Sequence, residues 1–218
     1  MLEVQALHIG YKKALIDQID LEAEAGEIVA VIGRNGTGKS TFLKTVGGLI
    51  PAVSGKITWN KDDILRINAK QRAQFISIVQ TSAPEWTGLT VQEVIALGAY
   101  PEKIEPNHEK VVSLLSTFRL EKVATQRVDE ISDGEQQKTM IARALMQDTP
   151  IILMDEPTAF LDYPSRKEWW ELVSDLRSKN KLIIVATHDI AMLREKGADR
   201  IWLFEQGKVS ERKDTPDW

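Results

Sequence analysis

Five short runs of apolar residues, many of them β-branched, recur along the chain and are separated by more polar segments. Runs of this length and composition are typical of strands that are buried on both faces of a sheet. They predict strands over residues 28–32, 75–79, 151–154, 182–186 and 201–204.

Between these runs, apolar residues recur at spacings of three and four, which is the pattern of helices with one buried face. The spacing predicts helices over residues 39–46, 132–146 and 165–178. Strands that alternate with helices in this way indicate an α/β fold with a mostly parallel sheet.

The N-terminal part of the chain has a different pattern. Residues 4–8 alternate only loosely between apolar and polar, residues 19–23 alternate better, and residues 56–59 form another short strand pattern. We interpret these three segments as a small antiparallel sheet that flanks the main sheet.

After about residue 81 the strand patterns stop, and helical patterns appear at residues 91–98 and 110–118. Prolines and glycines between them mark loops. We therefore expect one domain over residues 1–218, in which a helical subdomain of residues 82–148 is inserted into a core of residues 1–81 and 149–218.

The composition is that of an ordinary globular domain. With 43% hydrophobic and 28% charged residues, the chain can bury a core, which disordered sequences cannot do. The absence of cysteine excludes disulfides and thiolate chemistry. A net charge of -4 provides no broad cationic surface, so no nucleic-acid partner is expected.

The chain shows no membrane-spanning pattern. Its first residues lack a charged lead followed by a long apolar run, so no signal peptide is expected. No apolar stretch approaches the ~20 residues that span a bilayer. These patterns favour a soluble protein, which leaves docking on a membrane partner open.

Residues 33–40 read GRNGTGKS and stand between a predicted strand and a predicted helix. This context and the pattern G-x-x-x-x-G-K-[ST] indicate a phosphate-binding loop. Gly33, Gly36 and Gly38 would let backbone N–H groups turn inward around phosphate oxygens. A glycine-rich turn that only caps a helix would explain the glycines but not the Gly-Lys-Ser-Thr that follows in register.

The polar residues of this loop have predicted roles of their own. Lys39 would reach the β- and γ-phosphates of a nucleotide, and the Ser40 hydroxyl would bind Mg²⁺. The other loop residues predicted to contact the nucleotide are Asn35, Thr37 and Thr41.

Residues 151–156 read IILMDE, an apolar strand that ends in two acidic residues. Parallel α/β sheets bind their ligands at the carboxyl ends of the strands. Asp155 is therefore predicted to bind Mg²⁺, and Glu156 to act as general base or to position the attacking water. Alone, such a pair is more often a helix cap or a loop acid, but the phosphate loop favours the catalytic interpretation.

Residues 131–138 read ISDGEQQK and open a predicted helix, where Ser132 and Glu135 also fit a capping box. The segment resembles the signature of the ATP-binding-cassette (ABC) family, usually Leu-Ser-Gly-Gly-Gln followed by a glutamine and a basic residue. The matching residues are Ser132, Gly134, Gln137 and Lys138, and the departures are Ile131, Asp133 and Glu135.

Further residues resemble the remaining motifs of this family, in order along the chain. Tyr11 resembles the aromatic that stacks on adenine, and Gln80 resembles the glutamine that senses Mg²⁺ and couples to the membrane subunit. Asp162 resembles the aspartate of the D-loop, and His188 the switch histidine that contacts the γ-phosphate. Each alone has an ordinary structural explanation, and only their combination favours the family.

The resemblance covers essentially the whole chain and implies a P-loop NTPase (RecA-like) core that binds and hydrolyses ATP with Mg²⁺. It implies a head-to-tail homodimer, or a paired ABC subunit, with Ser132 and Gly134 of one chain contacting the ATP of the other. It also implies separate integral membrane permease subunits that dock near residues 81–101, with the ATPase cytoplasmic and peripheral on the inner face of the cell membrane.

Two details refine this expectation. The segments SDGE and VQEVIALGAYP resemble the corresponding segments of ATPases that import iron-siderophores, haem and cobalamin. Separately, Asp133 and Glu135 add negative charge where the partner's phosphate is expected. These acids therefore either point away from the phosphate or weaken dimer closure. The sequence ends soon after residues 207–209, where relatives usually carry another helical segment, so a truncated or a naturally short form is expected.

Two other functions stay open from the sequence. An ABC ATPase can drive a cytosolic assembly or regulatory partner instead of a transporter, and co-purification with an integral membrane protein would separate these cases. A different P-loop enzyme such as a nucleoside kinase would need a phosphate acceptor, and would have no use for the signature and the switch histidine.

Overall fold

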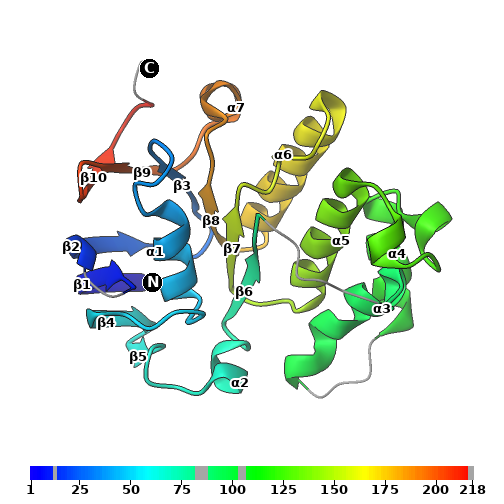
Figure 1. Cartoon of the computed structure of the whole chain (residues 1–218), viewed down its shortest axis with the longest axis horizontal. Helices are drawn as coiled ribbons and strands as arrows, with labels where there is room; N and C mark the ends of the chain where they lie inside the picture. Colours follow the sequence, from blue (N-terminus) through cyan, green and yellow to red (C-terminus); the bar gives the residue numbers. More distant parts are fainter. Residues whose placement is uncertain (12–13, 82–87, 103–106, 216–218) are drawn as a thin grey trace.

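The computed structural model of the chain describes residues 1–11, 14–81, 88–102 and 107–215. A four-stranded sheet and a six-stranded sheet form one side of the molecule, and a group of helices forms the other (Figure 1). None of the helices in these ranges has both the length and the apolar character needed to cross a membrane.

The six-stranded sheet has the order β10-β9-β3-β8-β7-β6, and its neighbouring strands are parallel except for β9 with β10. Its strands are β3 (Ile28–Ile32), β6 (Ile76–Val79), β7 (Ile151–Asp155), β8 (Leu182–Ala186), β9 (Arg200–Glu205) and β10 (Lys208–Arg212). The predicted α/β fold with a mostly parallel sheet is confirmed.

Successive residues of a strand face opposite sides of the sheet, and the central strands of this sheet are buried on both sides. In β3, Val29 and Val31 pack in the core that the smaller sheet covers. Ile28, Ala30 and Ile32 pack in the second core, which helices complete. Burial on both sides explains why the strands appear as uninterrupted apolar runs in the sequence.

The four-stranded sheet is antiparallel and has the order β2-β1-β4-β5, which confirms the predicted flanking sheet. Its strands are β1 (Leu2–Gly10), β2 (Ala14–Ala23), β4 (Ser54–Trp59) and β5 (Asp62–Asp63). Its apolar face packs against the six-stranded sheet and helix α1 (Lys39–Val46) to form a single core.

An irregularity in β1 explains its loose alternation. The register with β2 shifts between Val4 and Leu7, and Ala6 between them has a positive φ of 44°. Such a bulge lets both Val4 and Leu7 face the core although they are three positions apart. The backbone N–H of Ala6 donates to Asp20 Oδ1 at 2.7 Å, so this irregular peptide keeps a partner.

Helices cover both sides of the six-stranded sheet. Helix α1 lies on the side of the smaller sheet, and α6 (Tyr163–Ser178) belongs to the core on the opposite side (Figure 1). Beyond β6 lie α3 (Val91–Ala96), a 3-10 helix (Leu97–Glu102), α4 (His108–Thr117), 3-10 turns at Glu121–Val123 and Val128–Glu130, and α5 (Asp133–Met146). The predicted helical insertion is therefore present, whereas its treatment as a subdomain of residues 82–148 stays a prediction.

Several short elements are absent from the sequence prediction. Strand β10 follows a turn in which Gln206 and Gly207 both have positive φ, and its mostly exposed residues carry no apolar pattern. Helix α2 (Ala69–Arg72) buries no residue at all, and α7 (Ile190–Lys196) spans seven residues. A period of three to four residues cannot be detected over such lengths.

Candidate nucleotide-binding site

Four adjacent parallel strands end at one edge of the large sheet, and each leads into a predicted site residue. The residues that follow the strands are Gly33 after β3, His188 two positions after β8, Glu156 after β7, and Gln80 after β6. Because the strand order is β3-β8-β7-β6, the fold brings these four segments together at the carboxyl edge of the sheet.

Three glycines of the phosphate loop have positive φ angles, which favour glycine. Gly33, Gly36 and Gly38 have φ angles of 151°, 79° and 104°. At Gly33, a Cβ atom would lie 2.3 Å from the carbonyl oxygen of Phe204, which is backbone and cannot easily move away. Gly38 caps α1 without a side-chain hydrogen bond, so the first N–H groups of this helix are available to an anion.

An open cavity of about 270 Å³ lies over this loop. It is lined by Leu15, Asn35, Gly36, Gly38, Lys39, Ser40, Thr41 and Glu156. The structure thus brings most of the predicted loop residues together with the predicted catalytic acid. Thr37 is not among the lining residues, and its hydroxyl donates to the carbonyl oxygen of Arg34 at 2.8 Å, which closes the loop on itself.

Lys39 is buried and lines this cavity. Its Nζ donates to the carbonyl oxygens of Gly33 at 2.7 Å and Arg34 at 3.1 Å, so the ammonium lies inside the loop. Burial lowers the pKa of Lys39, and the nearby carboxylates of Glu156 and Asp155 oppose this effect. A cation held in an enclosed loop is well placed to receive a phosphate group.

Glu156 lines the cavity and forms a hydrogen-bonded pair with His188, which is not among the lining residues. The distance from His188 Nδ1 to Glu156 Oε2 is 2.8 Å. Burial raises the pKa of Glu156, while the neighbouring His188 and Lys39 act in the opposite direction. The side chain of His188 is 71% exposed, so its ring is open to a ligand while it contacts Glu156.

Asp155 has the environment of a metal ligand. Its Oδ1 atom is buried and has no hydrogen-bond partner among the described residues, and a divalent cation would satisfy such an oxygen. The hydroxyl of Thr81, directly after Gln80, donates to the carbonyl oxygen of Asp155 at 3.1 Å. Ser40 lines the adjacent cavity. These oxygen-bearing side chains therefore fit Mg²⁺.

Ser132 is the N-cap of α5 and forms the predicted capping box with Glu135. The Ser132 N–H and hydroxyl donate to the same carboxylate oxygen of Glu135, at 3.0 Å and 2.6 Å. These hydrogen bonds lower the pKa of Glu135. Neither residue lines the phosphate cavity of its own chain, and the acidic group lies directly on the Ser132 hydroxyl.

The start of α5 contacts the segment that follows Glu156. Gln137 Nε2 donates to the carbonyl oxygen of Pro157 at 3.2 Å, and a Cβ atom on Gly134 would lie 3.1 Å from the carbonyl oxygen of Phe160. Asp162 caps α6 by accepting a hydrogen bond from the Ser165 N–H at 3.0 Å, which lowers the pKa of this aspartate. The predicted signature and D-loop residues are thus neighbours within one chain.

Two N-terminal residues complete the picture of the cavity. Tyr11 is 70% exposed and is not among the lining residues, so its predicted stacking on adenine stays a prediction. Leu15 does line the cavity, and a Cβ atom on Gly38 would meet its side chain at 3.1 Å. Sequence reasoning missed Leu15, although two adjacent apolar residues, Leu15 and Ile16, in a strand with one buried face were a signal.

The loop, the buried lysine and the acidic strand end define a nucleotide-binding site of the P-loop type. The sequence pattern of the family described as "ABC transporter" matches residues 16–159, which is more than half of the chain. The chain belongs to the ABC transporter family, and it is an ATP-binding ATPase subunit of that family.

Individual relatives agree with this assignment. The chain is 34% identical to the achromobactin transport ATP-binding protein CbrD of Dickeya dadantii, over 84% of this chain and 71% of the relative. It is 32% identical to the ferric enterobactin transport ATP-binding protein FepC of Escherichia coli, over 95% of this chain and 79% of the relative. Both relatives belong to siderophore transport systems, the group that the sequence resembles.

A solved structure matches the whole fold. It is described as the dimeric structure of a post-hydrolysis state of the ATP-binding cassette MJ0796 bound to ADP and Pi. The TM-score is 0.89 with 27% sequence identity, and the match covers 100% of both chains. The predicted P-loop NTPase fold of the cassette type is therefore confirmed.

Proposed function

We propose that this ABC ATPase powers the import of an iron-siderophore type of substrate, as a head-to-tail dimer closed around two ATP molecules and docked on membrane permease subunits. In this proposal the ATPase lies on the cytoplasmic, inner face of the cell membrane. The observation that carries the catalytic part is the Glu156–His188 pair, joined at 2.8 Å, of which Glu156 lines the same cavity as Lys39.

Each side chain of the site has a role in this mechanism. The N–H groups of the phosphate loop and Lys39 bind the β- and γ-phosphates, so the hydrogen bonds of Lys39 Nζ to its own loop are exchanged for bonds to phosphate oxygens. Glu156 positions the attacking water and accepts its proton, and the raised pKa of this carboxyl brings it closer to working pH. His188 holds Glu156 and donates to the γ-phosphate.

Ser40, Gln80 and Asp155 are the residues that would hold Mg²⁺. When bound with the nucleotide, the ion would neutralise charge on the phosphate oxygens. Burial of the unpartnered Asp155 Oδ1 supports this assignment.

A second copy of the chain would complete the site. Ser132 and Gly134 lie outside the phosphate cavity of their own chain, and the matching MJ0796 cassette is described as dimeric. In a head-to-tail pair, the start of α5 would offer its N–H groups to the partner's γ-phosphate and stabilise the charge that develops during hydrolysis.

The permease would dock near residues 81–101, of which residues 82–87 lie outside the described part. A charge reversal at Glu93 would be an ambiguous probe, because Glu93 forms the capping box of α3 with Thr90. Tyr100 is a better one, since its side chain is 78% exposed. Tyr100→Glu should leave soluble ATPase activity unchanged and abolish transport, and normal transport would argue against this docking site.

Phosphate release from Mg²⁺-ATP by the purified protein tests the catalytic proposal. Glu156→Gln should still bind ATP but hydrolyse it at least about 100-fold more slowly, because the proton acceptor is lost. A variant with the wild-type rate would contradict the assigned role. Release without any added acceptor would also exclude a nucleoside kinase, and co-purification with an integral membrane protein would distinguish transport from a cytosolic assembly role.

A further inference from the structure

One arginine of α6 contacts two separate segments of the proposed active site. Arg166 Nε donates to the carbonyl oxygen of Leu161 at 3.0 Å. Its Nη1 donates to Asp189 Oδ2 at 3.5 Å and forms an ion pair with it. Leu161 directly precedes Asp162, and Asp189 directly follows His188, so a single guanidinium connects the two segments.

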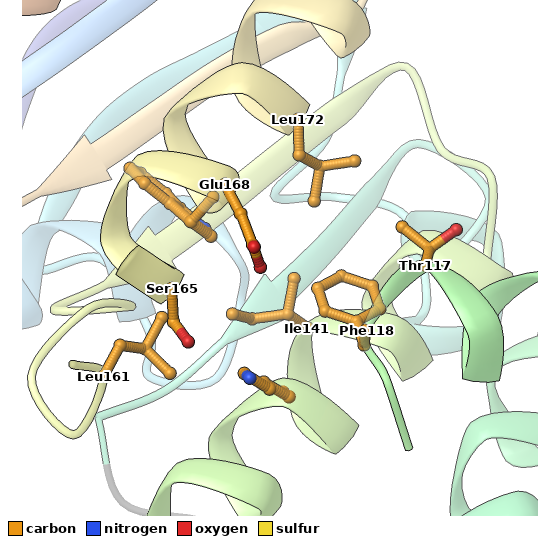
Figure 2. A pocket seen from close by; sticks show the side chains of 9 residues that line it. Thr117, Phe118, Ile141, Leu161, Ser165, Glu168 and Leu172 are labelled. Carbon is orange, nitrogen blue, oxygen red and sulfur yellow. The ribbon is translucent and has the colours of Figure 1, made fainter. Parts of the chain in front are cut away.

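The side chain of Leu161 is buried in the core on the helix side of the large sheet. It lines a small cavity of about 40 Å³, together with Ser165 and Glu168 of α6 and Phe118 at the end of α4 (Figure 2). The preceding side chain, Phe160, is 50% exposed. Core packing therefore holds the side chain of Leu161, and the hydrogen bond from Arg166 holds its carbonyl oxygen.

The Asp189 carboxylate in turn holds the backbone next to His188. Its Oδ1 accepts from the N–H of Met192 at 3.1 Å and caps α7, and the N–H of Asp189 donates to the Thr187 hydroxyl at 3.0 Å. The His188 side chain is 71% exposed, so burial does not fix its orientation. The position of the ring therefore depends on where the Asp189 carboxylate is held.

We propose that Arg166 is a positioning residue, which keeps His188 in hydrogen-bonding distance of Glu156 and couples this pair to the Leu161–Asp162 segment. The inference rests on the proposed roles of Glu156 and His188. A shift of the Leu161 carbonyl, as a partner chain binds, moves the guanidinium and with it the Asp189 carboxylate. An arginine is required because its planar fork donates in two directions at once, which a lysine ammonium on its flexible stem does not reproduce.

The test compares Arg166→Lys with Arg177→Lys, a matched control on the same helix. Arg177 also joins a backbone carbonyl to a carboxylate, because Nε donates to the Gly26 oxygen at 3.3 Å and Nη2 pairs with Asp199. This second bridge lies outside the residues that line the phosphate cavity. If Arg166 had only a structural role, its variant would change the thermal midpoint, as the control variant can, and leave kcat at the wild-type value.

For Arg166→Lys we expect kcat to fall about tenfold while the KM for ATP changes less than about twofold, since ground-state binding of the phosphates is untouched and only the catalytic geometry loosens. Arg177→Lys should retain the wild-type kcat. Asp189→Asn keeps an N-cap residue but removes the charge, so it should lower kcat similarly, and the double variant with Arg166→Lys should be no slower than either single variant.

The outcomes separate the two levels of the proposal. If the wild-type protein is active and Arg166→Lys has an unchanged kcat, the positioning role alone is overturned. The same holds if the losses of kcat from Arg166→Lys and Asp189→Asn are fully additive in the double variant. Wild-type protein that releases no phosphate from Mg²⁺-ATP overturns the proposed function and, with it, the positioning role.

Discussion

Replacing Glu135 by glutamine should strengthen the ATP-dependent dimer. In the structure, one oxygen of Glu135 accepts both the N–H and the hydroxyl of Ser132, at 3.0 Å and 2.6 Å. In the proposed function, Ser132 and the N–H groups at the start of α5 contact the partner's γ-phosphate, so this carboxylate lies beside the phosphate contact. Glutamine retains the capping box through its side-chain oxygen but removes the negative charge.

Two effects of this change act in the same direction. A hydrogen bond to a charged group stabilises by roughly 1 kcal/mol more than one between neutral groups, so Ser132 is released more easily from glutamine than from glutamate. A carboxylate ~6 Å from a phosphate charge costs about 3 kcal/mol at an effective dielectric constant near 20, before screening. Because Glu135 is only partly buried, salt reduces this term to about 1 kcal/mol.

The chain provides a matched control in a second capping box. At the start of α3, one oxygen of Glu93 accepts the N–H and the hydroxyl of Thr90 at 2.8 Å and 2.7 Å. Glu93→Gln therefore changes the same local chemistry away from the proposed dimer contact. Any general effect of neutralising a helix cap appears in both variants.

Sedimentation velocity with saturating ATP, in a Glu156→Gln background, measures the effect. Glu135→Gln should lower the dimer dissociation constant about thirtyfold, because the two effects add to about 2 kcal/mol, and Glu93→Gln should leave it unchanged. Equal dissociation constants for all three proteins would refute the argument that the Glu135 carboxylate competes with the partner's phosphate for Ser132.

Three further predictions concern the phosphate cavity. Burial raises the pKa of Glu156, so the ionised carboxylate destabilises the folded protein once the pH rises through that pKa. Glu156→Gln should therefore raise the thermal midpoint near pH 7 but not below about pH 4. An equal gain at both pH values would contradict this. Gly33→Ala should abolish ATP binding in a calorimetric titration, because its Cβ would lie 2.3 Å from the Phe204 oxygen, whereas Gly36→Ala, with nothing within 4 Å, should retain measurable binding. Leu15→Ala should weaken ATP binding by about fivefold in the same titration, since it removes about 1 kcal/mol of apolar contact, and unchanged affinity would exclude Leu15 from the site.

The sequence predicted the features that depend on local pattern. The central strands were found because burial on both sides gives continuous apolar runs, as in Ile28–Ile32. The phosphate loop was found because its glycines and Lys39 occur in a fixed spacing beside a strand and a helix. The capping box of Ser132 and Glu135 was found for the same reason, since its two members are three residues apart.

Features that depend on tertiary contact could not be predicted. Arg166 contacts Asp189, which is 23 positions away, and nothing in the local sequence marks either residue as part of the site. Leu15 belongs to the cavity only because β2 lies across Gly38. Strand β10 is mostly exposed and forms through its pairing with β9, so its own residues carry no apolar signal.

The central claim is that a complete ATPase site needs two chains, and mixing two inactive variants tests it most directly. Lys39→Ala removes the phosphate-binding lysine but keeps Ser132, and Ser132→Arg blocks the start of α5 but keeps Lys39. Each variant alone should be inactive. Random pairing of equal amounts should restore up to about a quarter of the wild-type phosphate release, because half of the dimers then carry one complete site of two. A mixture as inactive as its components would contradict the shared site.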